Sequence, residues 1–177
     1  TYRAIGSSNG MADFVGATYK YVAQNDFGAG DIPMTKPLYD AMLAHGRGMV
    51  HVPIAIGGIG VFHSVPESEL GGATLNLDAC LLAEIYAGSI TKWNDPKIKA
   101  KNPTLTATSI IYVAHRDEGS SSTAGFTEYL TMKCPEKWTL GGHSHFAPEE
   151  KWGNWPVGVR RQGSDGMATY LEECVPS

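Results

Sequence analysis

The sequence contains little net charge, no basic patch and no long apolar run, and each absence excludes a class of function. No stretch approaches the ~18 consecutive apolar residues of a membrane span. The formal net charge is −4 over 177 residues, so a nucleic-acid partner would meet no positive surface. An anionic ligand would have to be captured by local dipoles and by one or two well-placed cations.

Motifs for common catalytic and metal chemistry are also missing. There is no G-x-x-x-x-G-K-[ST] phosphate loop and no G-x-S-x-G nucleophile turn. His143 and His145 form an H-x-H pair without a suitably spaced third ligand, which is typical of a solvated loop. We therefore expect neither an enzyme nor a bound metal or cofactor. A serine hydrolase that uses His115 beside Ser120 is the weakest alternative.

Cysteine is scarce, and none of it occurs in a C-x-x-C pair. The three residues are Cys80, Cys134 and Cys174. Two interpretations remain open: one disulfide with one free thiol, or three buried thiols.

Glycine and proline are frequent, with 21 and 10 residues, which indicates short elements joined by tight turns. Apolar spacing predicts helices over Met11–Val22, from Pro37 to Gly46, from Asp78 to Gly88, from Pro96, from Thr123 and over Met167–Glu173. Apolar runs predict buried strands at Met49–Ile56, Ile59–Phe62 and Ile110–Ala114. Phe27–Asp31 is predicted as a short buried strand end or turn, and Trp155–Val157 as extended structure. This alternation predicts an α/β fold with a mainly parallel sheet covered on both faces.

Two Ser- and Gly-rich turns share one design, because each leads directly into a predicted helix. They are Gly6–Gly10 and Gly119–Thr123. The N-terminus of a helix offers unpaired N–H groups and about half a positive charge, and serine hydroxyls add donors. Arg116 beside the second turn can contribute a bidentate contact. The alternative is that both turns are ordinary helix caps.

Acidic residues next to these donors indicate which anion the site would bind. Asp31 ends the Phe27–Asp31 turn, and Glu118 lies in the second Ser-rich turn. A carboxylate beside an anion is repulsive unless the anion has a proton to donate, as monohydrogen phosphate has and sulfate has not. The alternatives are a turn-stabilising role for Asp31 and a solvated loop charge for Glu118.

Several motifs, in the same order, resemble the PstS-type phosphate-binding proteins of bacterial phosphate ABC importers. The motifs that carry this resemblance are Ile5–Gly10, Asp26–Met34, Val52–Gly58, Leu75–Asp78, Ile85–Pro96, the Arg116 loop, Phe126–Leu130, Trp155–Gly158 and Gly163–Gly166. The run Ile90–Pro96 is very specific to that family. The resemblance extends through most of the chain.

The resemblance implies an α/β fold like that of type II periplasmic binding proteins, with two lobes, mixed and mainly parallel sheets, and phosphate between the lobes. It implies that Ser7 and Ser8 donate hydrogen bonds to the phosphate and that Asp31 accepts the phosphate proton. It also implies that Arg116 pairs with the phosphate and with a carboxylate. Ser120, Ser121 and Ser122 would supply hydroxyl and backbone donors. Glu118 stands where the family usually has aspartate, and Ser121 replaces a usual glycine.

The family is nearly twice as long, so the resemblance also implies an incomplete first lobe. We expect residues 1–62 to be part of the first lobe and residues 63–177 to form the second. The implied function is binding of monohydrogen phosphate for uptake or sensing, in the periplasm or outside the cell, with an ABC importer as partner. The alternative is a domain reused as a structural subunit of a larger assembly, in an organelle lumen or at a surface, where other subunits complete the first lobe.

Overall fold

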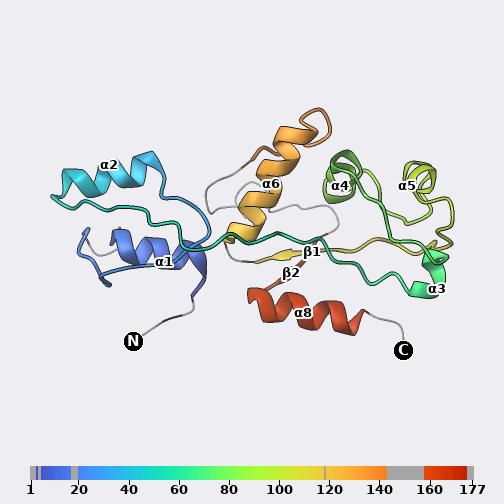
Figure 1. Ribbon diagram of the computed structural model, residues 1–177, viewed down its shortest axis with the longest axis horizontal. Coiled ribbons are helices and arrows are strands. Elements are labelled where there is room, and N and C mark those ends of the chain that lie inside the picture. Colours follow the sequence, from blue (N-terminus) through green and yellow to red (C-terminus); the bar gives the residue numbers. More distant parts are fainter. Residues whose placement is uncertain (1–2, 4, 17–19, 118, 143–157, 175–177) are drawn as a thin grey trace.

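In the part of the chain that the structure describes, the regular structure consists of helices and two short strands (Figure 1). The computed structural model describes residue 3 and residues 5–16, 20–117, 119–142 and 158–174. In chain order the elements are α1 (Gly6–Val15), α2 (Lys36–Ala44), α3 (Glu67–Leu70), α4 (Ala79–Tyr86), α5 (Pro96–Lys101), β1 (Val113–Arg116), α6 (Ser121–Lys133), β2 (Gly158–Arg161) and α8 (Gly163–Glu173). Within these described residues, no helix is both long and apolar enough to cross a membrane.

Local capping explains where two of the predicted helices begin. The Asp78 side chain accepts a hydrogen bond from the backbone N–H of Leu81 at the start of α4. Asp95 does the same for Lys97 at the start of α5, where Pro96 is the first helical residue. An aspartate cap satisfies N–H groups that the helix leaves unpaired, and proline fits the first turn because it lacks that N–H.

Helix α1 begins and ends earlier than predicted. The turn Gly6–Gly10 is the first half of the helix and not a loop before it. The helix stops at Val15 because Gly16 adopts the left-handed conformation, with φ of 71°, so the predicted continuation to Val22 is wrong. Glycine is favoured there because a Cβ would lie 2.3 Å from the carbonyl oxygen of Val22. Helix α8 likewise begins at Gly163, earlier than predicted.

The two strands form a parallel pair in which Val113 lies opposite Gly158 and Arg116 opposite Arg161. The predicted parallel pairing is therefore confirmed for these strands. Helix α8 packs against both of them, and α6 lies on the opposite side of β1 in Figure 1. The predicted strand at Ile110–Ala114 starts later, because Ile110 forms only an isolated bridge with Lys92. The segment predicted at 155–157 lies outside the described residues.

The predicted buried strands at Met49–Ile56 and Ile59–Phe62 are wrong. These residues run as an extended trace between the α1–α2 group and the rest of the molecule (Figure 1). Their large apolar side chains are exposed, and Ile54 reaches 83%. A strand forms only where a neighbour pairs with its N–H and C=O groups, and the described residues offer none here. The side chain of Ile59 contacts α6, where a Cβ on Gly125 would come within 2.7 Å of it.

The Phe27–Asp31 segment was predicted as a buried strand end or turn; it ends in a bend, but it is not buried. Phe27 is 83% exposed, and Asp31 lies in a bend. Asp31 in this bend is one of the residues predicted to bind the anion.

Helix α4 organises the core because its side chains enter two apolar clusters. Leu81 and Ile85 belong to the larger cluster, and Leu82 and Ala83 belong to the smaller one. The larger cluster comprises Val65, Leu81, Ile85, Ile90, Ile98, Leu105, Ala107, Ile111 and Val113. The smaller comprises Leu82, Ala83, Leu130, Cys134 and Trp138. Trp138 is one of the largest fully buried side chains and lies in the smaller cluster.

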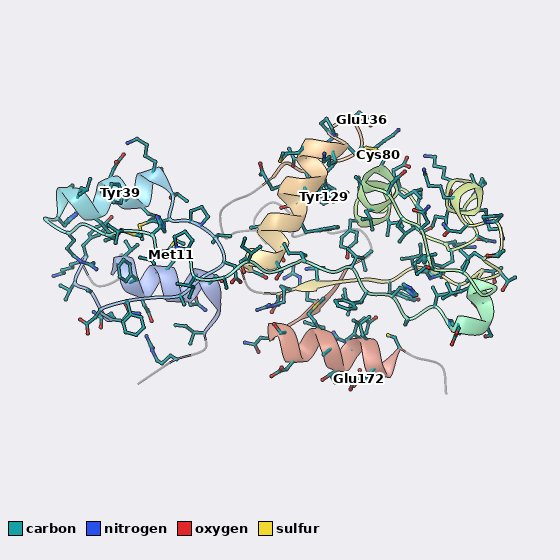
Figure 2. All side chains as sticks on the ribbon, viewed as in Figure 1. Met11, Tyr39, Cys80, Tyr129, Glu136 and Glu172 are labelled. Carbon is teal, nitrogen blue, oxygen red and sulfur yellow. A yellow bond between two sulfur atoms is a disulfide. The ribbon has the colours of Figure 1, made fainter. Side chains whose placement is uncertain are left out.

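A disulfide joins α4 to the end of α6. Cys80 and Cys134 are bonded across a sequence separation of 54 residues, and the Cys174 thiol is free and exposed. Of the two cysteine interpretations, the structure therefore has one disulfide and one free thiol. Figure 2 shows Cys80 and Glu136 together at the C-terminal end of α6. The bond anchors α6 to the core at the end away from its first residue, Ser121.

Candidate functional site

The N-termini of α1 and α6 meet through two serine side chains. Ser7, the second residue of α1, donates its hydroxyl to the Oγ of Ser121, the first residue of α6, at 3.2 Å. These residues are 114 positions apart in the sequence. The structure thus brings together the two Ser-rich segments that the sequence predicted to bind an anion.

Asp31 joins the same group from a third segment. The Ser121 hydroxyl donates to Oδ2 of Asp31 at 2.7 Å, across 90 positions. The neighbouring Gly30 lies close to α1, since a Cβ there would be 3.8 Å from the Cβ of Ser7. Ser7, Ser121 and Asp31 therefore form a continuous chain of hydrogen bonds that links α1, α6 and the bend between α1 and α2.

Both helix ends have donors to offer an anion. Ile5 precedes α1 and Ser120 precedes α6, and neither makes a side-chain capping hydrogen bond. The first N–H groups of a helix have no partner within the helix, and the helix dipole adds partial positive charge there. Ser120 is 6% exposed and Ser121 is 8% exposed, so these donors lie where water screens charge weakly.

Arg116 is the last residue of β1 and is half-buried. It leads within a few residues to Ser120 and Ser121, so the strand end and the helix start belong to one turn. This strand-to-helix arrangement was predicted from the sequence. Its parallel neighbour at the end of β2 is Arg161, and Arg160 forms an ion pair of 3.6 Å with Asp117.

Sequence reasoning missed the arginines of β2. Arg161 accepts, through its carbonyl, a hydrogen bond from the N–H of Asp117 at 3.0 Å, and its guanidinium lies 4.3 Å from the centre of the Tyr170 ring. Arg160 and Arg161 add positive charge at the end of β2 in a chain whose net charge is −4. The sequence signal was an Arg-Arg pair directly after an apolar run.

Arg47 is a second residue that the sequence reasoning missed. Its guanidinium donates to the carbonyl oxygens of Phe14 at 2.7 Å and of Val15 at 2.8 Å. These carbonyls belong to the last turn of α1, where a cation interacts favourably with the negative end of the helix dipole. Arg47 therefore anchors the end of α1 opposite to Ser7. Nothing in its local sequence indicates this contact, which spans more than 30 residues.

The remaining predicted residues are placed as follows. Ser122 is the second residue of α6 and is exposed. Ser8 is the third residue of α1, but its side chain lies outside the described part of the structure. Glu118 lies outside the described residues, as do His143 and His145.

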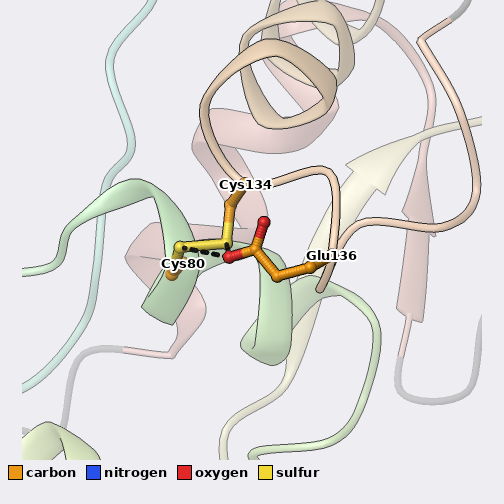
Figure 3. A group of neighbouring side chains, drawn as sticks. All are labelled: Cys80, Cys134 and Glu136. Atoms are coloured by element: carbon orange, nitrogen blue, oxygen red, sulfur yellow. Dashed lines mark hydrogen bonds between the residues drawn. A yellow bond between two sulfur atoms is a disulfide. The ribbon is translucent and has the colours of Figure 1, made fainter.

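One cluster has the composition of a metal site but not its chemistry. Oε1 of Glu136 lies 3.0 Å from the sulfur of Cys134 and 3.6 Å from that of Cys80 (Figure 3). The two sulfurs are bonded to each other, and metal ligation by cysteine requires thiolates. The oxidised group therefore cannot serve as a metal centre.

A family model described as "PBP superfamily domain" matches residues 1–174 of the chain. Nearly the whole sequence, including every described residue of the candidate site, falls within that match.

Curated relatives match over 97% of the chain. The phosphate-binding protein PstS of Haemophilus influenzae is 37% identical over 173 residues, which are 46% of its own length. PstS of Xylella fastidiosa strain 9a5c is 35% identical over 174 residues, or 42% of its length. Phosphate-binding protein PstS 3 of Mycobacterium tuberculosis strain H37Rv is 32% identical over 176 residues, or 45% of its length. The chain therefore spans less than half the length of these relatives.

Proposed function

The chain belongs to the PBP superfamily, whose domain covers residues 1–174, and we propose that it binds inorganic phosphate as monohydrogen phosphate. The observation that carries this proposal is the hydrogen-bonded chain from Ser7 through Ser121 to Asp31. It places hydroxyl donors, two helix N-termini and one carboxylate acceptor at a single point. The names of the relatives, which are phosphate-binding proteins, support the same ligand.

The donor and acceptor roles follow from the protonation of the ligand. The unprotonated oxygens of monohydrogen phosphate would accept from the hydroxyl of Ser7 and from the N–H groups at the start of α6. Arg116 would supply a charge-assisted contact, which is stronger than a neutral hydrogen bond. The single phosphate proton would be donated to Asp31. Sulfate has no proton to donate and would meet Asp31 as a repulsive neighbour.

The other predicted residues complete the proposed site. Ser120 and Ser122 would add donors in the first turn of α6, and Ser8 would do so in α1. Glu118 would also lie at the phosphate, as a second carboxylate beside Arg116 that favours the protonated anion. We infer two lobes, with residues 1–62 contributing to the first and residues 63–177 forming the second, so that Ser7 and Asp31 face Ser121 across the junction.

The biological setting proposed for this site is phosphate uptake or sensing by an exported binding protein. Delivery to an ABC importer in the membrane would be the uptake role. The relatives are named as binding proteins, which fits a chain that holds its ligand and does not convert it. The alternative hypothesis, that the chain is a structural subunit of a larger assembly, receives no support from those names.

Isothermal titration calorimetry with phosphate and with sulfate tests the proposed function. The proposal predicts binding heat with phosphate and a much weaker affinity for sulfate at neutral pH. The absence of phosphate binding, or equal affinities for the two anions, would overturn it.

A further inference from the structure

The Ser121 hydroxyl occupies a position on Asp31 that a ligand would need. It donates to Oδ2 of Asp31 at 2.7 Å, which is the kind of hydrogen bond that the protonated oxygen of a phosphate would make. The serine side chain is 8% exposed, so it is held at the junction and does not extend into solvent. The Ser121 hydroxyl therefore acts as an internal hydrogen-bond donor to Asp31.

We propose that Ser121 sets how strictly the site distinguishes protonated from unprotonated oxyanions. This inference rests on the proposed phosphate-binding function and deepens it. Because Ser121 satisfies Asp31 from within the protein, an anion that brings no proton does not leave that oxygen without a donor. The hydroxyl therefore lowers the selectivity for phosphate over sulfate that Asp31 alone would provide.

The hydrogen bonds available to each anion explain the effect. Monohydrogen phosphate donates to Asp31 itself, and the displaced Ser121 hydroxyl turns to donate to a phosphate oxygen. Sulfate leaves the Ser121–Asp31 hydrogen bond in place, so the carboxylate keeps its donor. Without the hydroxyl, sulfate faces an acceptor with no donor, which costs binding free energy. Phosphate still supplies its own proton to that acceptor.

A purely structural role for Ser121 predicts a different result. Through Ser7 on one side and Asp31 on the other, Ser121 also holds three segments together. If that were its whole contribution, loss of the hydroxyl would lower the affinity for both anions by the same factor. The ratio of the two affinities separates the two roles.

The test is calorimetry on Ser121→Ala, which removes the hydroxyl and keeps the Cβ. We expect the ratio of the sulfate Kd to the phosphate Kd to rise about threefold to tenfold, the factor that corresponds to one ordinary hydrogen bond. An unchanged or smaller ratio would overturn the inference. Ser68→Ala is the matched control, because Ser68 is exposed in α3, a helix distant from the site (Figure 1); its ratio should equal that of the wild type.

A second measurement tests the Ser121–Asp31 pair without any ligand. Urea unfolding of Ser121→Ala, Asp31→Ala and the double variant forms a double-mutant cycle. We expect the double variant to change the unfolding equilibrium about threefold less than the product of the single effects, because both single variants remove the same hydrogen bond. Independent effects would show that the pair is not coupled. If the wild type binds neither anion, the proposed function fails, and the cycle still decides whether Ser121 serves Asp31.

Discussion

The hydroxyl oxygens of Ser7 and Ser121 lie 3.2 Å apart although the residues are separated by 114 positions. This contact brings the positive ends of two helix dipoles together, an arrangement that is unfavourable unless negative charge is nearby. Asp31 supplies such a charge through its hydrogen bond to Ser121. The same electrostatics favour an anion at this point, and they are the physical basis of the proposed site.

Replacing Arg116 with alanine should weaken phosphate binding about tenfold to hundredfold, because a charge-assisted hydrogen bond contributes roughly 1.5–3 kcal/mol. Arg116→Lys should retain part of the affinity, since lysine keeps the charge but loses the planar fork. Calorimetry measures both, and circular dichroism checks that the variants are folded. Wild-type affinity in Arg116→Ala would show that the end of β1 does not contact the ligand.

Asp31→Asn should reduce selectivity for phosphate over sulfate, the opposite of the change expected for Ser121→Ala. An amide removes the repulsion toward sulfate and can donate to it, while phosphate loses a charged acceptor for its proton. We expect the ratio of sulfate Kd to phosphate Kd to fall about tenfold. Asp40→Asn is the control, because Asp40 lies in α2 and pairs with Lys36. Preserved selectivity in Asp31→Asn would contradict the assigned role.

The sequence predicted those parts of the fold that depend on local signals. The helices at Asp78 and Pro96 were predicted correctly because their starts depend on residues within three positions, as the Asp78 and Asp95 caps show. A helix after the second Ser-rich turn was also predicted, although it begins at Ser121 and not at Thr123. The apolar run at Met49–Ile56 was misjudged because strand formation depends on a partner strand, which the run itself does not reveal.

The candidate site was only partly predictable for the same reason. Its residue types were evident, since serine, arginine and an adjacent carboxylate suit a protonated oxyanion. The direct hydrogen bond from Ser121 to Asp31 was not, because it depends on how three distant segments meet. The contact of Arg47 with the end of α1 could not be predicted either, because it joins segments more than 30 residues apart.

Removing the disulfide should lower the free energy of unfolding. Cys80 and Cys134 close a loop with a separation of 54 residues, for which loop-closure entropy corresponds to about 4 kcal/mol. The double variant Cys80→Ser/Cys134→Ser, measured by urea unfolding, should therefore lose about 2–4 kcal/mol. Cys174→Ser is the control, because that thiol is free and exposed. Equal stability of the double variant and the wild type would show that the bond does not constrain the unfolded chain.

The Asp78 cap predicts a loss of stability in acid. The backbone N–H of Leu81, followed by the ammonium group of Lys101, lowers the pKa of Asp78 from its usual value. Because the folded pKa lies below the unfolded value of about 4, the stabilisation is complete above that value and is lost as pH falls through the folded pKa. Asp78→Ala should cost about 1 kcal/mol at pH 7.

The difference between wild type and Asp78→Ala should shrink as pH is lowered through the folded pKa. Urea unfolding at a series of pH values measures it, with Asp40→Ala as an exposed carboxylate control. A difference that does not change with pH would mean that the charge of Asp78 contributes nothing to the cap.

A crystal structure of the protein grown with phosphate tests the central claim most directly. The account predicts density for a tetrahedral anion within about 3 Å of the Ser7 hydroxyl, the first N–H groups of α6 and the Asp31 carboxylate, with the Ser121 hydroxyl turned from Asp31 toward the anion. Density for the anion at another place, or a Ser7–Ser121–Asp31 group that remains closed at saturating phosphate, would contradict it.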